Sequence, residues 1–170
     1  MTGDANGDAN GPAAYLDGLS PNAAARELRR CCGSERWASE MAARRPFGSD
    51  AALFVAAEDV WWDLEPDDWL EAFAAHPRIG ERGGGAWSAE EQAGMGDASR
   101  RLEAEIREGN RAYEAKFGHV FLICATGLTA AEMAAALDRR LDNDPEAELR
   151  IAAAEQAKIT KLRLGKLGAE

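Results

Sequence analysis

The stretch that decides the fold is residues 50–64, DAALFVAAEDVWWDL. Its apolar residues recur every three or four positions, as they do in an amphipathic helix that buries one side. These residues are Leu53, Ala56, Ala57, Val60, Trp61 and Leu64. The spacing predicts one helix with a continuous buried stripe.

Helix punctuation surrounds this stretch on both sides. Start signals stand at Ser20-Pro21, Ser34, Pro66, Thr129 with Glu132, and Asn143-Asp144-Pro145. A helix after Pro66 should end around Ala75, because the residue before a proline is pushed out of the helical region. β-branched residues are scarce and strict alternation is nearly absent, so we expect an all-α fold. The prediction is a single compact domain of about seven or eight helices with no substantial sheet.

Two segments stand apart from this helical pattern. Residues 1–14 (MTGDANGDANGPAA) consist mostly of Gly, Ala, Asp and Asn and are expected to form a disordered tail before a helical domain at 15–170. The apolar run 120–125 (VFLICA) fits either a buried strand or a buried helix, since periodicity does not separate the two.

Composition excludes several classes of protein. The chain has 170 residues and a formal net charge of −10, which argues against general binding to nucleic acid or to an anionic membrane. No apolar run approaches the ~20 residues that span a bilayer, and residues near Met1 lack a signal-peptide layout. Three cysteines make no disulfide framework, so we expect reduced thiols and a cytoplasmic protein.

The first candidate functional residue is His76, one of only two histidines. It lies at an expected helix C-terminus, where the unpaired carbonyls favour the imidazolium form. Pro77 fixes the direction of the chain beyond it, towards a glycine-rich loop. The residues alone also allow a structural role, with the histidine capping its own helix.

The second candidate is the segment 88–92, SAEEQ. Ser88 followed by Glu91 has the spacing of a capping box, in which Glu91 only satisfies the start of a helix. The functional alternative is that the helix N-terminus offers N–H donors to an anion. Ser88 and Gln92 would then add hydrogen bonds, with Glu91 beside them as an acid or base.

The third candidate is Arg163, in a basic stretch at the end of an acidic chain. Leu162 and Leu164 flank it, so we expect partial burial, and an arginine held in this way can bind a carboxylate with two hydrogen bonds. The alternative is a cation that completes the last turn of a helix. No metal-binding motif is present, because there is no His-Glu-x-x-His and the adjacent Cys31 and Cys32 have the wrong spacing for zinc.

Seven groups of residues, taken in order and spacing, carry a resemblance to a known family. They are CGSERW at 32–37 with RPF at 45–47, DWLEAF at 68–73 running into HPRIG at 76–80, SAEEQ at 88–92, Asn110-x-x-Tyr113 with KFG at 116–118, FLICATG at 121–127, Arg140-Leu141 through NDPE at 143–146, and Lys158-Ile159 to Arg163-Leu164. The chain resembles the 2-oxo-4-hydroxy-4-carboxy-5-ureidoimidazoline (OHCU) decarboxylases, which carry out the last step of urate breakdown to (S)-allantoin. The resemblance covers nearly everything after the tail.

This resemblance implies an all-helical homodimer that needs no cofactor and takes OHCU, a small anion, as substrate. It implies catalytic roles for His76, Glu91 and Arg163. It also implies substrate-binding positions at Pro77, Ser88, Ala89, Glu90, Gln92, Phe121, Leu122, Ile123, Cys124 and Ala125. One departure is His119-Val120, where many members have Phe-Pro or an aromatic and an aliphatic residue. This departure concerns the shape of the wall of the site at that place.

Two alternative functions remain open at this point. One is a helical adaptor without activity, in which His76, Glu91 and Arg163 have only structural roles. The other is decarboxylation of a related ureido acid. An adaptor should offer an apolar groove to a partner helix, whereas the enzyme should gather the three residues in one polar pocket.

Overall fold

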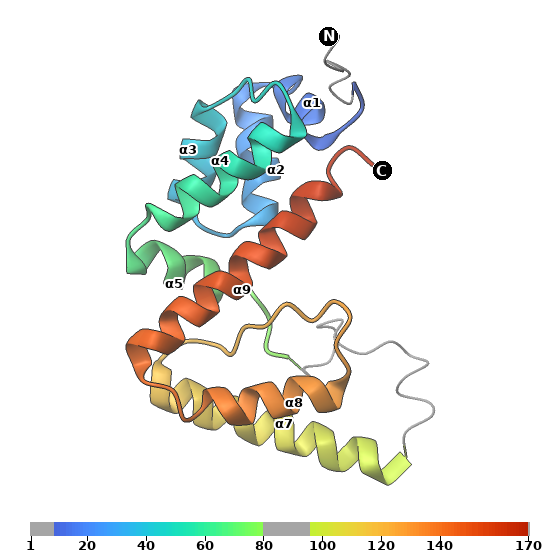
Figure 1. Cartoon of the computed structure of the whole chain (residues 1–170), viewed down its shortest axis with the longest axis vertical. Helices are drawn as coiled ribbons and strands as arrows, with labels where there is room; N and C mark the ends of the chain where they lie inside the picture. Colours follow the sequence, from blue (N-terminus) through green and yellow to red (C-terminus); the bar gives the residue numbers. More distant parts are fainter. Residues whose placement is uncertain (1–8, 80–95, 170) are drawn as a thin grey trace, which may run out of the picture. The chain divides into compact units, whose positions relative to one another are not determined.

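The computed structural model describes residues 9–79 and 96–169, and every regular element in these ranges is an α-helix (Figure 1). The bounds are α1 Pro12–Asp17, α2 Pro21–Cys31, α3 Glu35–Ala43, α4 Asp50–Trp62, α5 Pro66–Ala74, α7 Gly96–Phe117, α8 Ala130–Arg140 and α9 Pro145–Gly165. The predicted all-α class and the absence of a substantial sheet are confirmed for this part of the chain.

The described helices belong to two compact units. The first unit comprises residues 1–72 and 157–170, and the second comprises residues 73–156. The boundary falls inside α5 and inside α9, where the sequence shows no change of composition and no linker. For this reason the sequence carries no sign of the division.

The core of the first unit forms around α4, which packs against α1 and α3. All six residues of the predicted apolar stripe are buried, as the spacing requires. Trp37 on α3 is also fully buried, and its indole N–H donates to the carbonyl of Ala57 at 3.2 Å. This bond satisfies the one polar atom of the tryptophan inside an apolar core.

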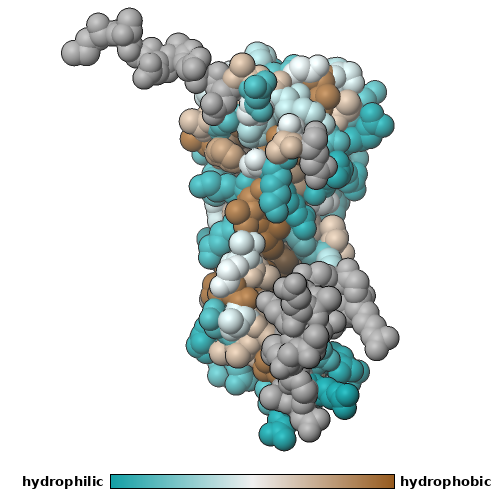
Figure 2. Space-filling view, turned by 90° about the vertical axis from the view of Figure 1, so that its right-hand side faces the viewer, coloured by the Kyte–Doolittle hydropathy of each residue, from teal (hydrophilic) through white to brown (hydrophobic). Residues whose placement is uncertain are grey.

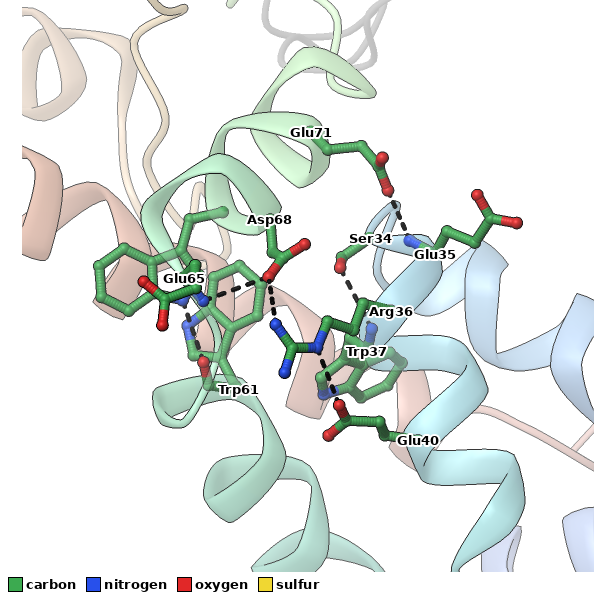
Figure 3. Close-up of polar contacts among 10 residues, drawn as sticks. Ser34, Glu35, Arg36, Trp37, Glu40, Trp61, Glu65, Asp68 and Glu71 are labelled. Carbon is green, nitrogen blue, oxygen red and sulfur yellow. Dashed lines mark hydrogen bonds and ion pairs between the residues drawn. The ribbon is translucent and has the colours of Figure 1, made fainter.

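Polar contacts join α5 to the N-terminal end of α3 in the first unit (Figure 3). The Ser34 hydroxyl caps α3 by accepting from the backbone N–H of Trp37 at 3.2 Å. The Glu71 carboxylate accepts from the backbone N–H of Glu35 at 2.5 Å. An acidic group at a helix N-terminus interacts favourably with the helix dipole, so Glu71 holds α5 against the start of α3.

The first helix begins earlier than the sequence suggests. Pro12 occupies its first turn and Ala13 is buried, although both lie inside the segment 1–14 that was expected to be a disordered tail. The backbone N–H of Ala13 donates to Asp50 at 2.9 Å. This long-range bond explains the difference, since a contact with a partner 37 residues away leaves no local pattern.

The second unit is built on α7 and α8, which lie side by side (Figure 1). Its core consists of Tyr113, Phe121, Ile123, Met133, Ala136 and Leu137. The predicted N-cap of α8 is confirmed, because the Thr129 hydroxyl accepts from the backbone N–H of Glu132 at 3.1 Å.

The run 120–125 is neither a strand nor a helix. Its backbone crosses the second unit without regular structure, although Phe121, Leu122 and Ile123 are buried. A buried backbone of this kind needs hydrogen-bond partners from side chains. Those partners are described with the site below.

The visible surface of the described residues is largely hydrophilic (Figure 2). Figure 2 shows hydrophilic residues over much of the visible face, with hydrophobic residues in smaller groups. Within the described ranges, no helix combines the length and apolar character needed to cross a bilayer.

Candidate functional site

His76 lies two residues beyond the end of α5, where the sequence places it. Its backbone N–H donates to the carbonyl of Phe73 at 3.1 Å. Its ring, however, contacts a different helix, because Nε2 lies 2.6 Å from Oε1 of Gln156 on α9. The imidazole is therefore oriented by a residue 80 positions away, in addition to any role in ending its own helix.

The residues after His76 are fixed to α7. The Arg78 guanidinium binds the Glu114 carboxylate, with Nε to Oε1 at 2.6 Å and Nη2 to Oε2 at 3.2 Å. The carbonyl of Ile79 accepts from the Asn110 side chain at 2.9 Å. Pro77, which the resemblance places at the substrate, is exposed between these two anchors and His76.

The segment 121–125, expected to contact substrate through its backbone, is held at two points. The Leu122 carbonyl accepts from Nη1 of Arg140 at 2.8 Å. The Cys124 N–H donates to Oε1 of Glu155 at 3.4 Å. Glu155 and Gln156 are neighbours, so one turn of α9 contacts both His76 and the segment 121–125. The second unit thus brings two predicted parts of the site to the same place.

A buried ion pair supports this arrangement. Glu148 on α9 is fully buried and accepts hydrogen bonds from Tyr113 at 2.6 Å, from Nε of Arg140 at 2.7 Å and from Asn143 at 3.0 Å. Nη2 of Arg140 is also 2.5 Å from the carboxylate, although it lacks hydrogen-bond alignment. The guanidinium lies over the Phe121 ring, 4.6 Å from its centroid. Burial and the adjacent Glu148 carboxylate raise the pKa of Tyr113, which keeps the phenol protonated as a hydrogen-bond donor.

The second histidine, His119, has a packing role. Its ring lies 5.3 Å from that of Phe73 and 5.4 Å from that of Tyr113, measured between centroids. Its Nδ1 is 3.1 Å from the carbonyl of Val120. The His119 imidazole therefore packs against aromatic rings as an aromatic side chain would.

Arg163 belongs to the first unit and is exposed as a residue, while its contact with Cys31 is partly buried, so the expectation of partial burial holds only for this contact. Of the two flanking leucines only Leu164 is buried, while Leu162 is 42% exposed, and the flanking pattern therefore overstated the burial of the position between them. The Arg163 guanidinium donates to the carbonyl of Cys31 at 3.4 Å. It borders a cavity of about 300 Å³ that Tyr15, Glu27, Arg30 and Lys166 also line.

The remaining expectations for the site concern residues 88–92 and the placement of His76 relative to Arg163. Ser88, Ala89, Glu90, Glu91 and Gln92 lie outside the described residues. His76 and Arg163 lie in different units, so the structure describes each only among its own neighbours. The convergence of the imidazole, the carboxylate and the guanidinium therefore stays a prediction.

Sequence reasoning gave no role in the site to three polar residues of the second unit: Arg140, Glu148 and Gln156. Gln156 had one usable signal, since the buried residues Ala152, Ala153, Gln156 and Thr160 recur at helical spacing along α9. A polar residue on such a stripe needs a partner. No similar signal marked Glu148, because an acid in the first turn of a helix is usually explained by the helix dipole.

Metal binding has no support in the described ranges. There, no group of three or more His, Cys, Asp or Glu side chains is placed to hold a metal ion. Burial raises the pKa of Cys31 to about 12 and that of Cys32 to about 11, so both thiols stay protonated at neutral pH.

Comparison with known proteins gives a consistent result. A family model for OHCU decarboxylase matches residues 17–165. The uric acid degradation bifunctional protein TTL of Arabidopsis thaliana is 41% identical over 150 residues, which are 83% of this chain and 46% of the plant protein. The 2-oxo-4-hydroxy-4-carboxy-5-ureidoimidazoline decarboxylase of Haloferax volcanii is 32% identical over 132 residues, which are 75% of this chain and 79% of that protein. The chain thus spans about half the length of the plant relative and most of the archaeal one.

Solved structures agree with the sequence comparison. The crystal structure of an OHCU decarboxylase in the presence of (S)-allantoin has 41% sequence identity and a TM-score of 0.73, with 85% of this chain and 98% of that chain covered. An (S)-allantoin synthase with 22% identity, a TM-score of 0.67 and coverage of 89% of this chain and 52% of that chain shares the fold. Because the family model matches residues 17–165 and the relatives agree with it, the protein belongs to the OHCU decarboxylase family.

Proposed function

We propose that the protein decarboxylates OHCU to (S)-allantoin and CO2, the last step of urate degradation, without a cofactor. The observation that carries this proposal is the likeness to an OHCU decarboxylase over 98% of its crystallised chain, at 41% identity. The position of His76 supports it, because the imidazole is held at a helix end by a long-range contact.

The chemistry requires an electron acceptor for the pair released when CO2 leaves. Many decarboxylases obtain one from pyridoxal phosphate or thiamine. OHCU contains its own acceptor, because a ring C=N bond adjoins the carbon that carries the carboxylate and the hydroxyl. The C–C bond to the carboxylate breaks, its electron pair moves into the ring, and an enol-like intermediate results. A proton delivered to one face then sets the S centre.

The protein's part is to orient the substrate and to manage protons. His76 would exchange a proton with the hydroxyl or carboxyl region as a general acid/base. Glu91 would serve a ring or ureido nitrogen, and Arg163 would bind a polar end of the anion. Ser88 and Gln92 would fix the position of the ring, with backbone atoms of 121–125 along its edge.

The deciding experiment measures product chirality, since the spontaneous reaction gives racemic allantoin. Freshly generated OHCU is incubated with the wild type and with His76→Ala, and the optical activity of the product is followed by circular dichroism. We expect His76→Ala to lower the stereospecific rate by ~10²–10⁴, the usual effect of removing one acid/base group. A loss of less than about tenfold would contradict the role of His76.

His119→Phe is the matched control, because it replaces the other histidine by an aromatic residue that resembles what many family members have at this position. It should leave the stereospecific rate close to that of the wild type. A wild-type protein that turns over an analogue of OHCU but not OHCU itself would favour the related ureido acid as substrate. Absence of turnover with any of these compounds would favour the adaptor.

Electrostatics gives a second expectation. The net charge of −10 opposes long-range attraction of an anionic substrate, so the site can act only at short range. The value of kcat/KM should therefore change little with ionic strength. A steep fall with added salt would indicate steering and count against this account.

We also propose that the protein works as a homodimer in the cytoplasm. The family resemblance supports the dimer, and the three free cysteines agree with a reducing compartment. Light scattering coupled to size-exclusion chromatography tests the oligomeric state, and a monomer at assay concentration would contradict the dimer.

A further inference from the structure

In the second unit, the imidazole of His76 lies against the side-chain amide of Gln156. Nε2 of the imidazole lies 2.6 Å from the amide oxygen Oε1, which is a short distance for a hydrogen bond. Gln156 is 0% exposed and His76 is half-buried. A buried amide oxygen accepts hydrogen bonds and donates none.

The identity of the atom that faces Nε2 favours one tautomer of the ring. Because Oε1 faces Nε2, the hydrogen of the neutral ring must be on Nε2 for the bond to form. Nδ1 then carries the lone pair and is the basic nitrogen. A second-sphere partner of this kind commonly fixes the tautomer and the orientation of a functional histidine.

The chemical nature of the partner also matters. A carboxylate at this position would stabilise the imidazolium strongly, because opposite charges at hydrogen-bond distance favour the charged form. The amide of Gln156 is neutral, so it orients the ring while allowing both protonation states. A group that must take up and release a proton in each turnover needs this property.

The surroundings agree with a positioning role. His76 is the second residue after α5, and its backbone N–H is bound to the carbonyl of Phe73. The chain beyond it is anchored to α7 through Ile79. With the backbone held on both sides, the contact with Gln156 restricts rotation of the ring itself.

We propose that Gln156 is a positioning residue that orients the His76 ring for proton transfer and holds its proton on Nε2. This inference rests on the proposed function for its catalytic part. The tautomer itself is a property of the free protein and is measured without substrate.

The test uses the full chain labelled with ¹⁵N in histidine. Long-range proton–nitrogen spectra at a pH where the rings are neutral distinguish a protonated from an unprotonated ring nitrogen. Only two histidines contribute, and His119→Phe assigns the signals of His76. We expect a protonated Nε2 and an unprotonated Nδ1 for His76 in the wild type.

Gln156→Met removes the acceptor while keeping a side chain of similar length. It should shift His76 towards the tautomer mixture of a free imidazole and lower kcat about tenfold or more, with little change in KM, since a misoriented acid/base group affects the chemical step. Gln156→Glu retains an oxygen at this position and should keep the proton on Nε2. Thr160→Val is the matched control, because Thr160 is another buried polar residue of α9 whose hydroxyl bonds Cys32, and it should leave the tautomer unchanged.

The outcomes separate the two proposals. A wild-type ring with its proton on Nδ1, or a Gln156→Met variant with the wild-type tautomer, would overturn the role of Gln156 even if the wild type makes (S)-allantoin. A changed tautomer with unchanged kcat would also overturn it. Failure of the proposed function is a different result, namely a wild type without stereospecific turnover, and the tautomer measurement does not depend on it.

Discussion

Replacing Glu148 by glutamine should lower the free energy of unfolding far more than the loss of one charge on the surface would. Glu148 is fully buried, and its carboxylate accepts from Tyr113, Arg140 and Asn143. The variant keeps the shape of the side chain but leaves the guanidinium of Arg140, 8% exposed, without its counter-charge. Breaking a buried ion pair on one side costs about 3–5 kcal/mol.

This cost is large on the scale of a whole protein, because total stabilities are about 5–15 kcal/mol. For a chain of this size it corresponds to a fall in Tm on the order of 6–20 °C. Urea unfolding followed by far-ultraviolet circular dichroism measures the change. Glu40→Gln is the matched control, since it removes a carboxylate from an exposed pair with Arg36 and should leave the midpoint unchanged.

A double-mutant cycle isolates the interaction. Arg140→Met alone should also be strongly destabilising, because it leaves the buried Glu148 carboxylate unpaired. The double variant Arg140→Met with Glu148→Gln should cost clearly less than the sum of the single changes. A cost below about 1 kcal/mol for Glu148→Gln, or additive effects in the cycle, would refute the reasoning.

Three further predictions concern stability and thiol chemistry. Ser34→Ala should cost about 1–2 kcal/mol and more than Ser20→Ala, because both hydroxyls cap a helix at 3.2 Å but only Ser34 is buried; equal costs in urea unfolding would contradict this. Gly109→Ala should be destabilising although helix propensity favours alanine by about 1 kcal/mol, because an added Cβ would lie 2.6 Å from a buried leucine of α8. A raised Tm would contradict this and would show that the leucine side chain moves aside at little cost. Cys31 and Cys32 should resist a thiol reagent at pH 8 until the protein is unfolded, while the third, partly exposed cysteine reacts. Burial raises the pKa values of Cys31 and Cys32 from 9.0 to about 12 and about 11. The contribution of the two protonated thiols to the free energy of unfolding is therefore full below pH 9 and is lost as the pH rises through those values. Rapid native labelling of all three thiols would contradict the burial.

The helices were predictable because their signals are local. The stripe of residues 50–64, the N-caps at Ser20 and Thr129, and the end of α5 near His76 each depend on neighbours within a few positions. The structure confirms all of them. It differs at Pro12, where a long-range bond orders residues of low complexity, and in the run 120–125, where side chains satisfy the backbone in place of a regular ladder.

The site was predictable only in part, for the same reason. Position and order along the chain identified His76 and the segment 121–125, and the structure brings both to one turn of α9. The residues that hold them are polar groups buried by tertiary packing, such as Gln156, and a single sequence does not distinguish these from exposed ones. Arg163 shows the limit of flanking patterns, since its two neighbouring leucines leave the residue exposed apart from its contact with Cys31.

The guanidinium of Arg140 has a consequence for the engineering of this protein. The same planar group pairs with the buried Glu148 carboxylate and donates to the peptide carbonyl of Leu122, in the segment that we propose contacts the substrate. A substitution at Arg140 should therefore lower the free energy of unfolding and also release the backbone of the proposed substrate-binding segment 121–125. Mutant libraries designed to raise the thermal stability of the protein should keep Arg140 constant and vary the exposed faces of α2 and α7.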